Sequence, residues 1–225
     1  KISRFLMEFG KEYLFTIQLG IETNTHDRWG ELLRTTSPQG ISLKDILDVT
    51  SRFRGRYQQI APEISAIKHR GTPLYKLARS GRNVPTKTKV VRIHKLEVID
   101  YYHPFVTMRL VCSSGTYVRS IARDIGRQLG CGACVFCLRR TRVGPHSQSE
   151  AVGLKSLIDD ENPGRHLISM EQSLEHLPRV YLKPQSIPKI RSGKQPNSFD
   201  IEQVDVDSNE DYVALVAPNG HLVGI

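Results

Sequence analysis

Alternation of apolar and polar residues marks several short segments of the chain as strands that bury one face. Within residues 13–19, Tyr13 shares a face with three other apolar residues, and the polar side chains fall on the opposite face. We therefore expect Tyr13 to point towards the core. The segments with a strand pattern are 13–19, 91–98, 106–112, 134–138 and the two arms of a hairpin, 212–217 and 221–225, which flank a Pro-Asn-Gly turn.

Two further segments have the spacing of helices. Ser42 and Asp45 form a capping pair at the start of a helix that we expect to end near Gly55. A second, short helix is predicted over 73–79, beginning at its proline and closed by Gly81. The residues that form the apolar stripe of the first helix are Leu43, Ile46, Leu47, Thr50 and Phe53.

A third helix is predicted after Gly115, with Thr116 as its N-cap and Gly130 at its end. Arg119 falls in the first turn, where the helix dipole disfavours a positive charge. Two interpretations remain open: a solvated surface arginine, or a partly buried guanidinium directed at a carboxylate or phosphate. The residues that stack along this helix are Tyr117, Ile121 and Ile125.

Composition narrows the class of protein. The 225 residues include 32 Lys and Arg against 23 Asp and Glu, and the net charge of +9 suggests a polyanionic partner such as RNA or DNA. No apolar run approaches the roughly 20 residues of a membrane span, and no signal peptide pattern follows the start. We expect a cytoplasmic protein that does not contact membranes. Because Lys1 is not an initiator methionine, we also expect the chain to begin inside a larger protein.

Four cysteines raise the question of a metal site. Cys131, Cys134 and Cys137 form a Cys-x2-Cys-x2-Cys run, and Cys112 is available as a fourth ligand. The apolar residues between them are typical of a strand, which sends alternate side chains to opposite faces. We therefore expect free buried thiols and no metal site. A disulfide framework is not expected in a basic chain without a secretory signal.

Several motifs follow one another in a fixed order. They are Lys-Glu-Tyr-Leu-Phe-Thr-Ile-Gln-Leu-Gly at 11–20, Thr-Asn-Thr-His-Asp at 23–27, Phe-Arg-Gly at 53–55, Ser-Ala-Ile-Lys at 65–68, Gly-Thr-Tyr-Val-Arg-Ser at 115–120, Leu-Gly-Cys-Gly-Ala at 129–133 and Leu-Arg-Arg at 138–140. In this order they resemble the bacterial tRNA pseudouridine synthase B family, which isomerises uridine-55 in the T-loop of tRNA to pseudouridine. The resemblance implies an α+β fold, with a mixed, mainly antiparallel sheet flanked by helices.

The resemblance also implies roles for particular residues. The tyrosine that matches Tyr13 lies against the target base and is a candidate for proton removal, and the arginine that matches Arg119 pairs with the nucleophilic aspartate. Asp27, Leu138 and Tyr117 match positions that contact the substrate, and Leu138 matches an apolar wall of the active site. From the residues alone, core packing is the favoured role of Tyr13, Leu138 could pack in the core as well, and Asp27 could be an exposed turn residue.

Basic residues are candidates for binding the phosphates of tRNA, although each could equally be a solvated surface charge. Those that resemble the family's RNA-clasping insertion, at about 56–90, are Lys68, His69, Arg70, Lys76 and Arg79, and those nearer the pocket are Arg139, Arg140 and Arg142. The resemblance implies a catalytic domain over 1–178 and, over 179–225, an incomplete PUA-like RNA-binding module that touches the acceptor stem.

The family's nucleophilic aspartate sits in a Gly-x-Leu-Asp-Pro motif, which does not occur in the 225 residues. The resemblance places it upstream, so we expect the chain by itself to bind tRNA weakly and to catalyse nothing. The family's reaction needs no metal or organic cofactor, and we expect a monomer. Two other hypotheses remain open: a noncatalytic tRNA-binding or folding protein, and a cysteine-ligated metal module that binds nucleic acid.

Overall fold

The protein is described by a computed structural model of residues 2–64, 68–69, 71–74, 76, 80, 86–205 and 211–225. Its contacts divide it into two compact units. One is Met7–Ala151, and the other combines the residues up to Leu6 with Val152–Ile225. In the part of the chain that is described, no helix is long and apolar enough to cross a membrane.

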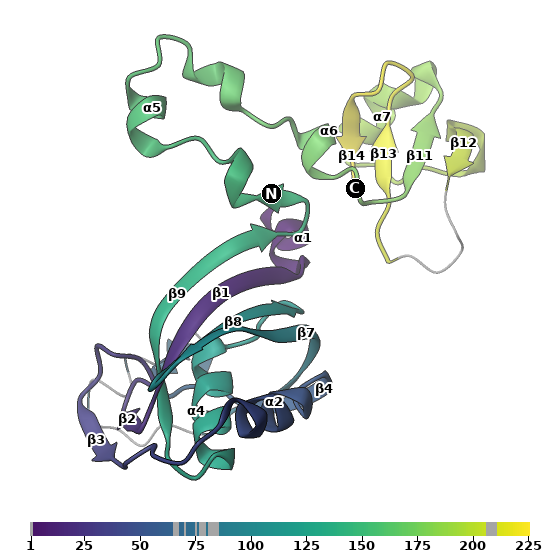
Figure 1. Cartoon of the computed structure of the whole chain (residues 1–225). Coiled ribbons are helices and arrows are strands. Elements are labelled where there is room, and N and C mark those ends of the chain that lie inside the picture. Colours follow the sequence, from purple (N-terminus) through teal and green to yellow (C-terminus); the bar gives the residue numbers. More distant parts are fainter. Residues whose placement is uncertain are drawn as a thin grey trace. The chain divides into compact units, whose positions relative to one another are not determined.

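An antiparallel sheet organises the unit Met7–Ala151, and its long curved strands are seen in Figure 1. Within the described residues it has six strands in the order β10-β9-β1-β8-β7-β4. The central strand, β1, pairs with β8 on one side and with β9 on the other. The strand bounds are β1 Lys11–Leu19, β4 Gly55–Ile60, β7 Thr88–Tyr102, β8 Phe105–Cys112, β9 Ala133–Val143 and β10 His146–Ser147. Two short ribbons accompany the sheet, β2 Ile21–Thr23 with β3 Leu32–Thr35 and β5 Lys68–His69 with β6 Thr72–Pro73.

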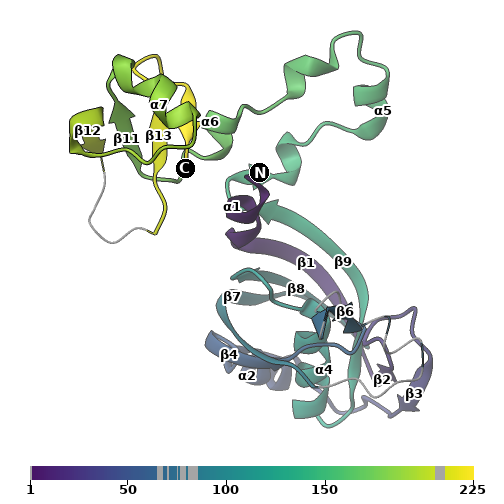
Figure 2. The ribbon, with the colours of Figure 1, turned by 180° about the vertical axis from the view of Figure 1, so that it is seen from behind.

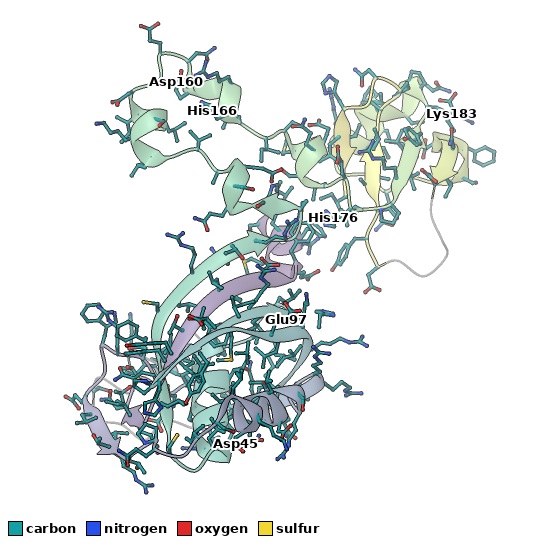
Figure 3. All side chains as sticks on the ribbon, viewed as in Figure 1. Asp45, Glu97, Asp160, His166, His176 and Lys183 are labelled. Carbon is teal, nitrogen blue, oxygen red and sulfur yellow. The ribbon has the colours of Figure 1, made fainter. Side chains whose placement is uncertain are left out.

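Two helices, α2 (Leu43–Ser51) and α4 (Val118–Gln128), pack on one face of this sheet (Figure 2). Helix α2 begins with the predicted capping box between Ser42 and Asp45, which is labelled in Figure 3. The core lies between these helices and the sheet, and each large side chain buried there contributes roughly 1.5–3 kcal/mol. Its fully buried members include Phe15, Ile17, Leu19, Ile46, Ile93, Met108, Leu110, Ile121 and Ile125.

The other unit contains a small sheet with the strand order β12-β11-β13-β14 in its described residues. Strands β11 and β13 are parallel, and the remaining pairs are antiparallel. Before this sheet, Asp160 accepts hydrogen bonds from Arg165 and His166; Asp160 and His166 are labelled in Figure 3. The bounds are α5 Leu154–Ile158, α6 Met170–Ser173, β11 Arg179–Leu182, α7 Ile187–Arg191, β12 Ile201–Asp205, β13 Ala214–Val216 and β14 Leu222–Gly224. Elsewhere in the chain lie α1 Ser3–Glu8 and the short 3-10 helices η1 Gln148–Glu150, η2 Pro163–His166, η3 Pro184–Ser186 and η4 Ser198–Asp200.

The predicted α+β fold, its strands and its C-terminal hairpin are confirmed. Strand β1 buries Phe15, Ile17 and Leu19 on the predicted face. The segments 91–98 and 106–112 lie within β7 and β8, and the hairpin is formed by β13 and β14. The predicted domain boundary after residue 178 stays a prediction.

Three details of the helix predictions are wrong. Thr116 does not cap α4, because its hydroxyl donates to the carbonyl of Ser113 at 2.9 Å and Tyr117 occupies the N-cap position. Helix α2 ends at Ser51, and Gly55 instead opens strand β4. The stripe of α2 is also rotated from the expected one. Leu43 and Leu47 are exposed, whereas Val49 is buried with Ile46 and Phe53.

The predicted helix over 73–79 falls mostly outside the described residues. Pro73 closes the short strand β6, and Leu74 and Lys76 have helical backbone. The extent of that helix therefore stays a prediction.

Candidate active site

The first turn of α4 is held by side chains from both β4 and α4. Gln59 is fully buried on β4, and its amide nitrogen donates to the carbonyl of Gly115 at 2.9 Å. Its amide oxygen accepts the backbone N–H of Tyr117 at 3.1 Å. The hydroxyl of Ser120 donates to the last carbonyl of β4 at 2.7 Å. Because a buried amide is stable only when its polar atoms are paired, these bonds fix the point from which Arg119 leaves the helix.

Arg119 reaches from this turn into a group of oxygen acceptors. Its Nη1 donates to the carbonyl of Thr25 at 2.9 Å and lies 3.4 Å from Oδ2 of Asp27. Its Nη2 donates to the carbonyl of Ile64 at 2.8 Å. The side chain is 23% exposed. The structure therefore shows the partly buried guanidinium rather than the solvated one, and the acceptors offset its unfavourable place in the helix dipole.

Asp27 is the carboxylate partner of Arg119 in the described structure, whereas the resemblance predicted an aspartate from outside this sequence. Its Oδ1 accepts the hydroxyl of Thr25 at 2.7 Å and the backbone N–H of Trp29 at 3.1 Å. Its backbone carbonyl accepts the hydroxyl of Thr23 at 2.7 Å. These bonds within the loop fix the orientation of the Asp27 carboxylate. Asp27 can therefore orient the guanidinium of Arg119.

This loop is attached to the edge of β9. The backbone N–H of Val135 donates to the carbonyl of His26 at 3.0 Å, and the N–H of Arg28 donates to the carbonyl of Val135 at 2.9 Å. Asp27 thereby stands opposite Val135 in a parallel bridge. His26 has a φ of 60°, in the left-handed region that residues other than glycine rarely adopt. The bridge therefore fixes the backbone of Asp27 beside β9, in the way that strand pairing fixes a residue within a sheet.

Tyr13 lies farther along the same pair of strands. In the register it stands between Leu110 on β8 and Arg140 on β9, and its half-buried ring packs against the core. Burial raises the pKa of the Tyr13 phenol above its usual range, and the charge and hydrogen bond of Arg140 oppose that shift. At neutral pH Tyr13 is therefore a protonated phenol beside a cation.

Leu138 lies on β9 between these two groups. It stands opposite Phe15, so it shares the inner face of the sheet with Phe15 and Tyr13, yet it is 48% exposed. From the bridge at Val135 to the pair Tyr13–Arg140 is a span of five residues, about 16 Å of strand. We call this set the β9 row: the Asp27–Arg119 ion pair, Leu138, and Tyr13 with Arg140.

The remaining basic candidates do not converge on a single point. The side chains of Arg139, Arg140 and Arg142 are exposed on the outer half of β9. Arg140 shares the face of Tyr13, whereas Arg139 stands opposite Leu14 on the other face. The backbones of Lys68 and His69 form β5, and Lys76 is exposed. The side chains of Lys68 and His69, and all of Arg70 and Arg79, lie outside the described residues, so their role stays a prediction.

Three of the four cysteines are buried as predicted, namely Cys112, Cys131 and Cys134. Cys137 is exposed on β9, so the expectation of a buried thiol is wrong at this position, where the outer half of the strand is uncovered. Burial raises the pKa of the Cys134 thiol to about 11, which makes it a poor thiolate ligand at neutral pH. Among the described residues, no group of three or more His, Cys, Asp or Glu side chains could hold a metal ion.

Sequence reasoning missed Gln59 and Thr25, which hold the two sides of the site. The signal that could have found Gln59 was an amide side chain on the inward face of a strand, the face that it shares with Tyr57 two residues earlier. The Tyr57 hydroxyl donates to the carboxylate of Asp124 on α4, and Arg123 donates to the same carboxylate at 2.7 Å. Burial raises the pKa of Tyr57 first, and the bond to Asp124 raises it further.

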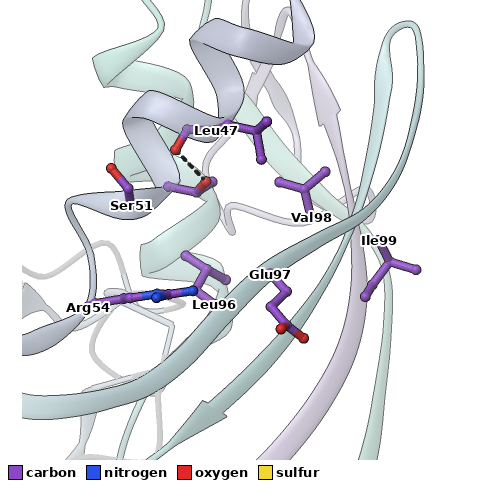
Figure 4. Close-up of a pocket in the computed structure, with 8 residues that line it drawn as sticks. Leu47, Ser51, Arg54, Leu96, Glu97, Val98 and Ile99 are labelled. Atoms are coloured by element: carbon purple, nitrogen blue, oxygen red, sulfur yellow. Dashed lines mark hydrogen bonds between the residues drawn. The ribbon is translucent and has the colours of Figure 1, made fainter.

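A separate hollow of about 550 Å³ lies between α2 and β7 (Figure 4). Its walls are formed by residues at the end of α2 and by the segment 96–99 of β7. Leu47, which was predicted to lie on the apolar stripe of its helix, lines this hollow and is exposed. No predicted site residue is among its lining residues, so the hollow is distinct from the β9 row.

Comparisons with known proteins assign a family. The profile of the TruB family pseudouridylate synthase (N terminal domain) matches residues 1–118, and that of the tRNA pseudouridylate synthase B C-terminal domain matches residues 119–176. The chain is 39% identical over 181 residues to tRNA pseudouridine synthase B of Francisella tularensis, covering 80% of this chain and 57% of that protein. It is 37% identical over 225 residues to tRNA pseudouridine synthase B of Syntrophotalea carbinolica, covering 99% and 73%. The chain thus spans little more than half the length of the Francisella relatives.

Solved structures agree on the fold. A crystal structure of a Cbf5-Nop10-Gar1 complex aligns with a TM-score of 0.73 at 24% identity, over 98% of this chain and 60% of the compared chain. The structure of an H/ACA RNP bound to a substrate RNA containing 2'-deoxyuridine aligns with a TM-score of 0.71 at 22% identity, over 98% and 59%. At these identities the likeness shows a shared fold.

Proposed function

Because this chain belongs to the TruB family of pseudouridylate synthases, we propose that it carries most of the active site of an enzyme that converts a uridine of tRNA to pseudouridine. The observation that supports this most directly is the β9 row. It combines a positioned guanidinium, an uncovered leucine on the inner face of the sheet and a protonated phenol along one strand.

The row has the chemistry that a flipped uracil requires. Leu138 and the ring of Tyr13 offer apolar surface to the faces of the base, and the Asp27–Arg119 pair offers polar groups to its edge. The reaction breaks the bond from N1 of uracil to C1' of ribose and forms a bond from C5 to C1'. The proton on C5 leaves to a base and a proton is placed on N1, so the atoms balance without any cofactor.

Arg119 would act on the nucleophile of this reaction. Its contacts with the described residues use three of the five N–H donors of a guanidinium, which leaves two for a further carboxylate. A cation in this position stabilises the ionised carboxylate and fixes its direction. The Gly-x-Leu-Asp-Pro motif assigned to the nucleophile does not occur in the 225 residues. We therefore propose that these residues alone bind tRNA without isomerising it.

Tyr13 would lie against the base. Its raised pKa keeps the hydroxyl protonated in the free protein, and Arg140 is the group that favours the phenolate. Removal of the C5 proton by Tyr13 therefore depends on Arg140. Tyr13 would thus both stack on the base and accept its proton, with Arg140 favouring the phenolate.

The basic surface supports a nucleic-acid substrate. The net charge is +9, and the exposed arginines 139, 140 and 142 lie on the outer half of β9 next to the row. We propose the T-loop as the target, binding of the acceptor stem by the residues from 179 onward, a cytoplasmic location and a monomeric enzyme. The relatives' names support tRNA as the substrate.

Arg119→Ala in the full-length protein tests this function. We expect tRNA binding to change little and pseudouridine formation to fall by about 100- to 1000-fold, as when a positioned electrostatic group is lost. Arg109→Ala is the matched control, since Arg109 is exposed on β8 and stands opposite Leu14, on the face of the sheet that Tyr13 does not share. Formation of pseudouridine at the wild-type rate by Arg119→Ala would contradict the assignment. A full-length protein that binds tRNA and forms none would favour the noncatalytic alternative.

A further inference from the structure

Next to the β9 row, an arginine is held between two aromatic rings at the protein surface. The guanidinium carbon of Arg28 lies 4.6 Å from the ring centroid of Trp29 and 4.8 Å from that of Phe136. Phe136 in turn lies 4.9 Å from Phe105, with the ring planes at 57°. We call these four side chains the Trp29 stack.

Trp29, the outer member of this stack, is unusually exposed for a tryptophan. Trp29 is 82% exposed, although tryptophan is usually among the most covered side chains. The phenylalanines at the inner end are half-buried on β8 and β9, and they anchor the ladder to the sheet. The indole is therefore held at its base by a cation and is available for a further planar group.

The backbone around Trp29 is fixed as well. Its N–H donates to Oδ1 of Asp27 at 3.1 Å, and the neighbouring N–H of Arg28 donates to the carbonyl of Val135. The loop therefore presents the indole from an anchored position. A pre-positioned ring loses little conformational entropy when a partner binds.

The stack and the active site lie on the two sides of one strand edge. Asp27 and Arg28 are consecutive residues at the bridge to Val135, and consecutive residues in extended chain direct their side chains to opposite faces. Asp27 meets Arg119 on the face covered by α4, whereas Arg28 meets Phe136.

We propose that the Trp29 stack is a binding platform for one unpaired base of the RNA, a nucleotide next to the target uridine. The proposal rests on the proposed function, since it takes RNA as the substrate. Aromatic rings and arginine planes bind unpaired bases by stacking, without selecting a particular base. The positive charge inside the ladder and the net charge of the chain favour a nucleic acid over an apolar protein segment.

Fluorescence can test this directly, because Trp29 is the sole tryptophan of the 225 residues. The 225-residue chain is titrated with an RNA stem-loop that carries the T-arm sequence of tRNA. Binding is measured in parallel by anisotropy of a dye on the RNA. We expect quenching of the tryptophan emission that saturates together with the anisotropy. Binding without any change in emission would overturn the proposal.

Substitutions separate stacking from general loss of structure. Trp29→Leu removes the ring and should weaken RNA binding by roughly 5- to 100-fold, whereas Trp29→Tyr should retain most of the affinity. Leu47→Ala is the control, because it removes an exposed apolar side chain of the same unit, and Leu47 lies on α2 and contributes nothing to the stack. Equal affinities for Trp29→Leu and the wild type would overturn the proposal.

Abasic RNAs locate the partner base. Each unpaired nucleotide beside the target uridine is replaced in turn by an abasic one. At one position we expect the abasic RNA to lose affinity for the wild type but not for Trp29→Leu. Losses that simply add at every position would overturn the proposal. In the full-length protein, RNA binding that depends on Trp29 but is followed by no pseudouridine formation would contradict the proposed function alone. Wild-type pseudouridine formation without quenching would contradict the platform alone.

Discussion

The amide of Gln59 replaces the missing side-chain cap of α4 by binding the backbone N–H of Tyr117 from a different element. The donor and acceptor are 58 residues apart in sequence and 3.1 Å apart in space. The same amide binds the carbonyl of Gly115. The start of the helix that carries Arg119 is thus tied to β4 by this amide.

Gln59→Leu should therefore destabilise the unit Met7–Ala151 by about 1–3 kcal/mol, because the N–H of Tyr117 and the carbonyl of Gly115 both lose their hydrogen-bond partner. Urea denaturation followed by circular dichroism measures the loss. Gln58→Leu, at the neighbouring exposed position of β4, should stay within about 0.5 kcal/mol of the wild type. Equal stabilities for the two variants would show that the amide does not hold the turn.

Tyr13→Phe should abolish most pseudouridine formation in the full-length protein while leaving its stability nearly unchanged. The ring and its packing remain, and the hydroxyl beside Arg140 is lost. Turnover at the wild-type rate would reduce Tyr13 to a packing residue. Absorbance titration, as the difference between the wild type and Tyr13→Phe, should show a phenol that ionises above the usual range.

Arg140→Ala should raise the pKa of Tyr13 further, because the charge and hydrogen bond of Arg140 oppose the effect of burial. The same difference titration measures this change. Arg139→Ala, on the opposite face of β9, is the matched control and should leave the pKa where it is. A shift of equal size in both variants would mean that only the overall charge matters.

Low pH should destabilise the unit that contains Val152–Ile225 by protonating the carboxylate of Asp200. Its carboxylate accepts bonds from Lys189, Ser186 and the backbone of Asn197, and these, the bond from Lys189 foremost, lower its pKa to about 2. A carboxyl group with a depressed pKa stabilises the fold fully above its usual value of 3.8, and this stabilisation is lost as the pH falls towards 2.

Asp200→Asn should therefore weaken the unit at neutral pH and flatten its stability between pH 4 and pH 2. Urea midpoints measured across that range give the slope. Asp205→Asn, at the exposed end of β12, serves as the control. A slope in Asp200→Asn as steep as in the wild type would contradict this account.

Native thiol titration should detect a single fast cysteine. Cys137 is exposed, whereas Cys112, Cys131 and Cys134 are buried. An aromatic disulfide reagent should thus label one thiol quickly in the folded chain and all four after unfolding. Cys137→Ser should remove the fast phase. Uniform protection that is lost on adding a chelator would instead revive the metal hypothesis.

Local patterns in the sequence predicted the parts of the fold that depend on neighbouring residues. The alternation in 13–19 predicted the inner face of β1, and Ser42 with Asp45 predicted the capping box. The prediction of Thr116 as the N-cap was wrong because its hydroxyl can form either of two local hydrogen bonds. In the structure it donates to the carbonyl of Ser113 and does not accept an N–H of the helix N terminus. Leu43 and Leu47 were misjudged because a stripe on a short helix has no fixed centre until its partner sheet is known.

The site depended on contacts that no local pattern contains. Arg119 and Asp27 are 92 residues apart. The other acceptors of Arg119 are the backbone carbonyls of Thr25 and Ile64, which every residue type carries and which no sequence motif marks. The family motifs pointed to both charged residues, although they did not predict that these residues would bind each other. Gln59 belonged to no motif used, and its role follows from its place under the turn at Gly115.

The central position of β1 has a consequence for biosynthesis. Its partners β8 and β9 end at Cys112 and Val143, so a growing polypeptide emerges with both edges of this central strand unpaired. At about 5–20 residues per second, ribosomes need roughly 10 s to deliver the second partner. During that interval the nascent segment can pair with other chains. We therefore expect the unpaired β1 to contribute to aggregation during synthesis.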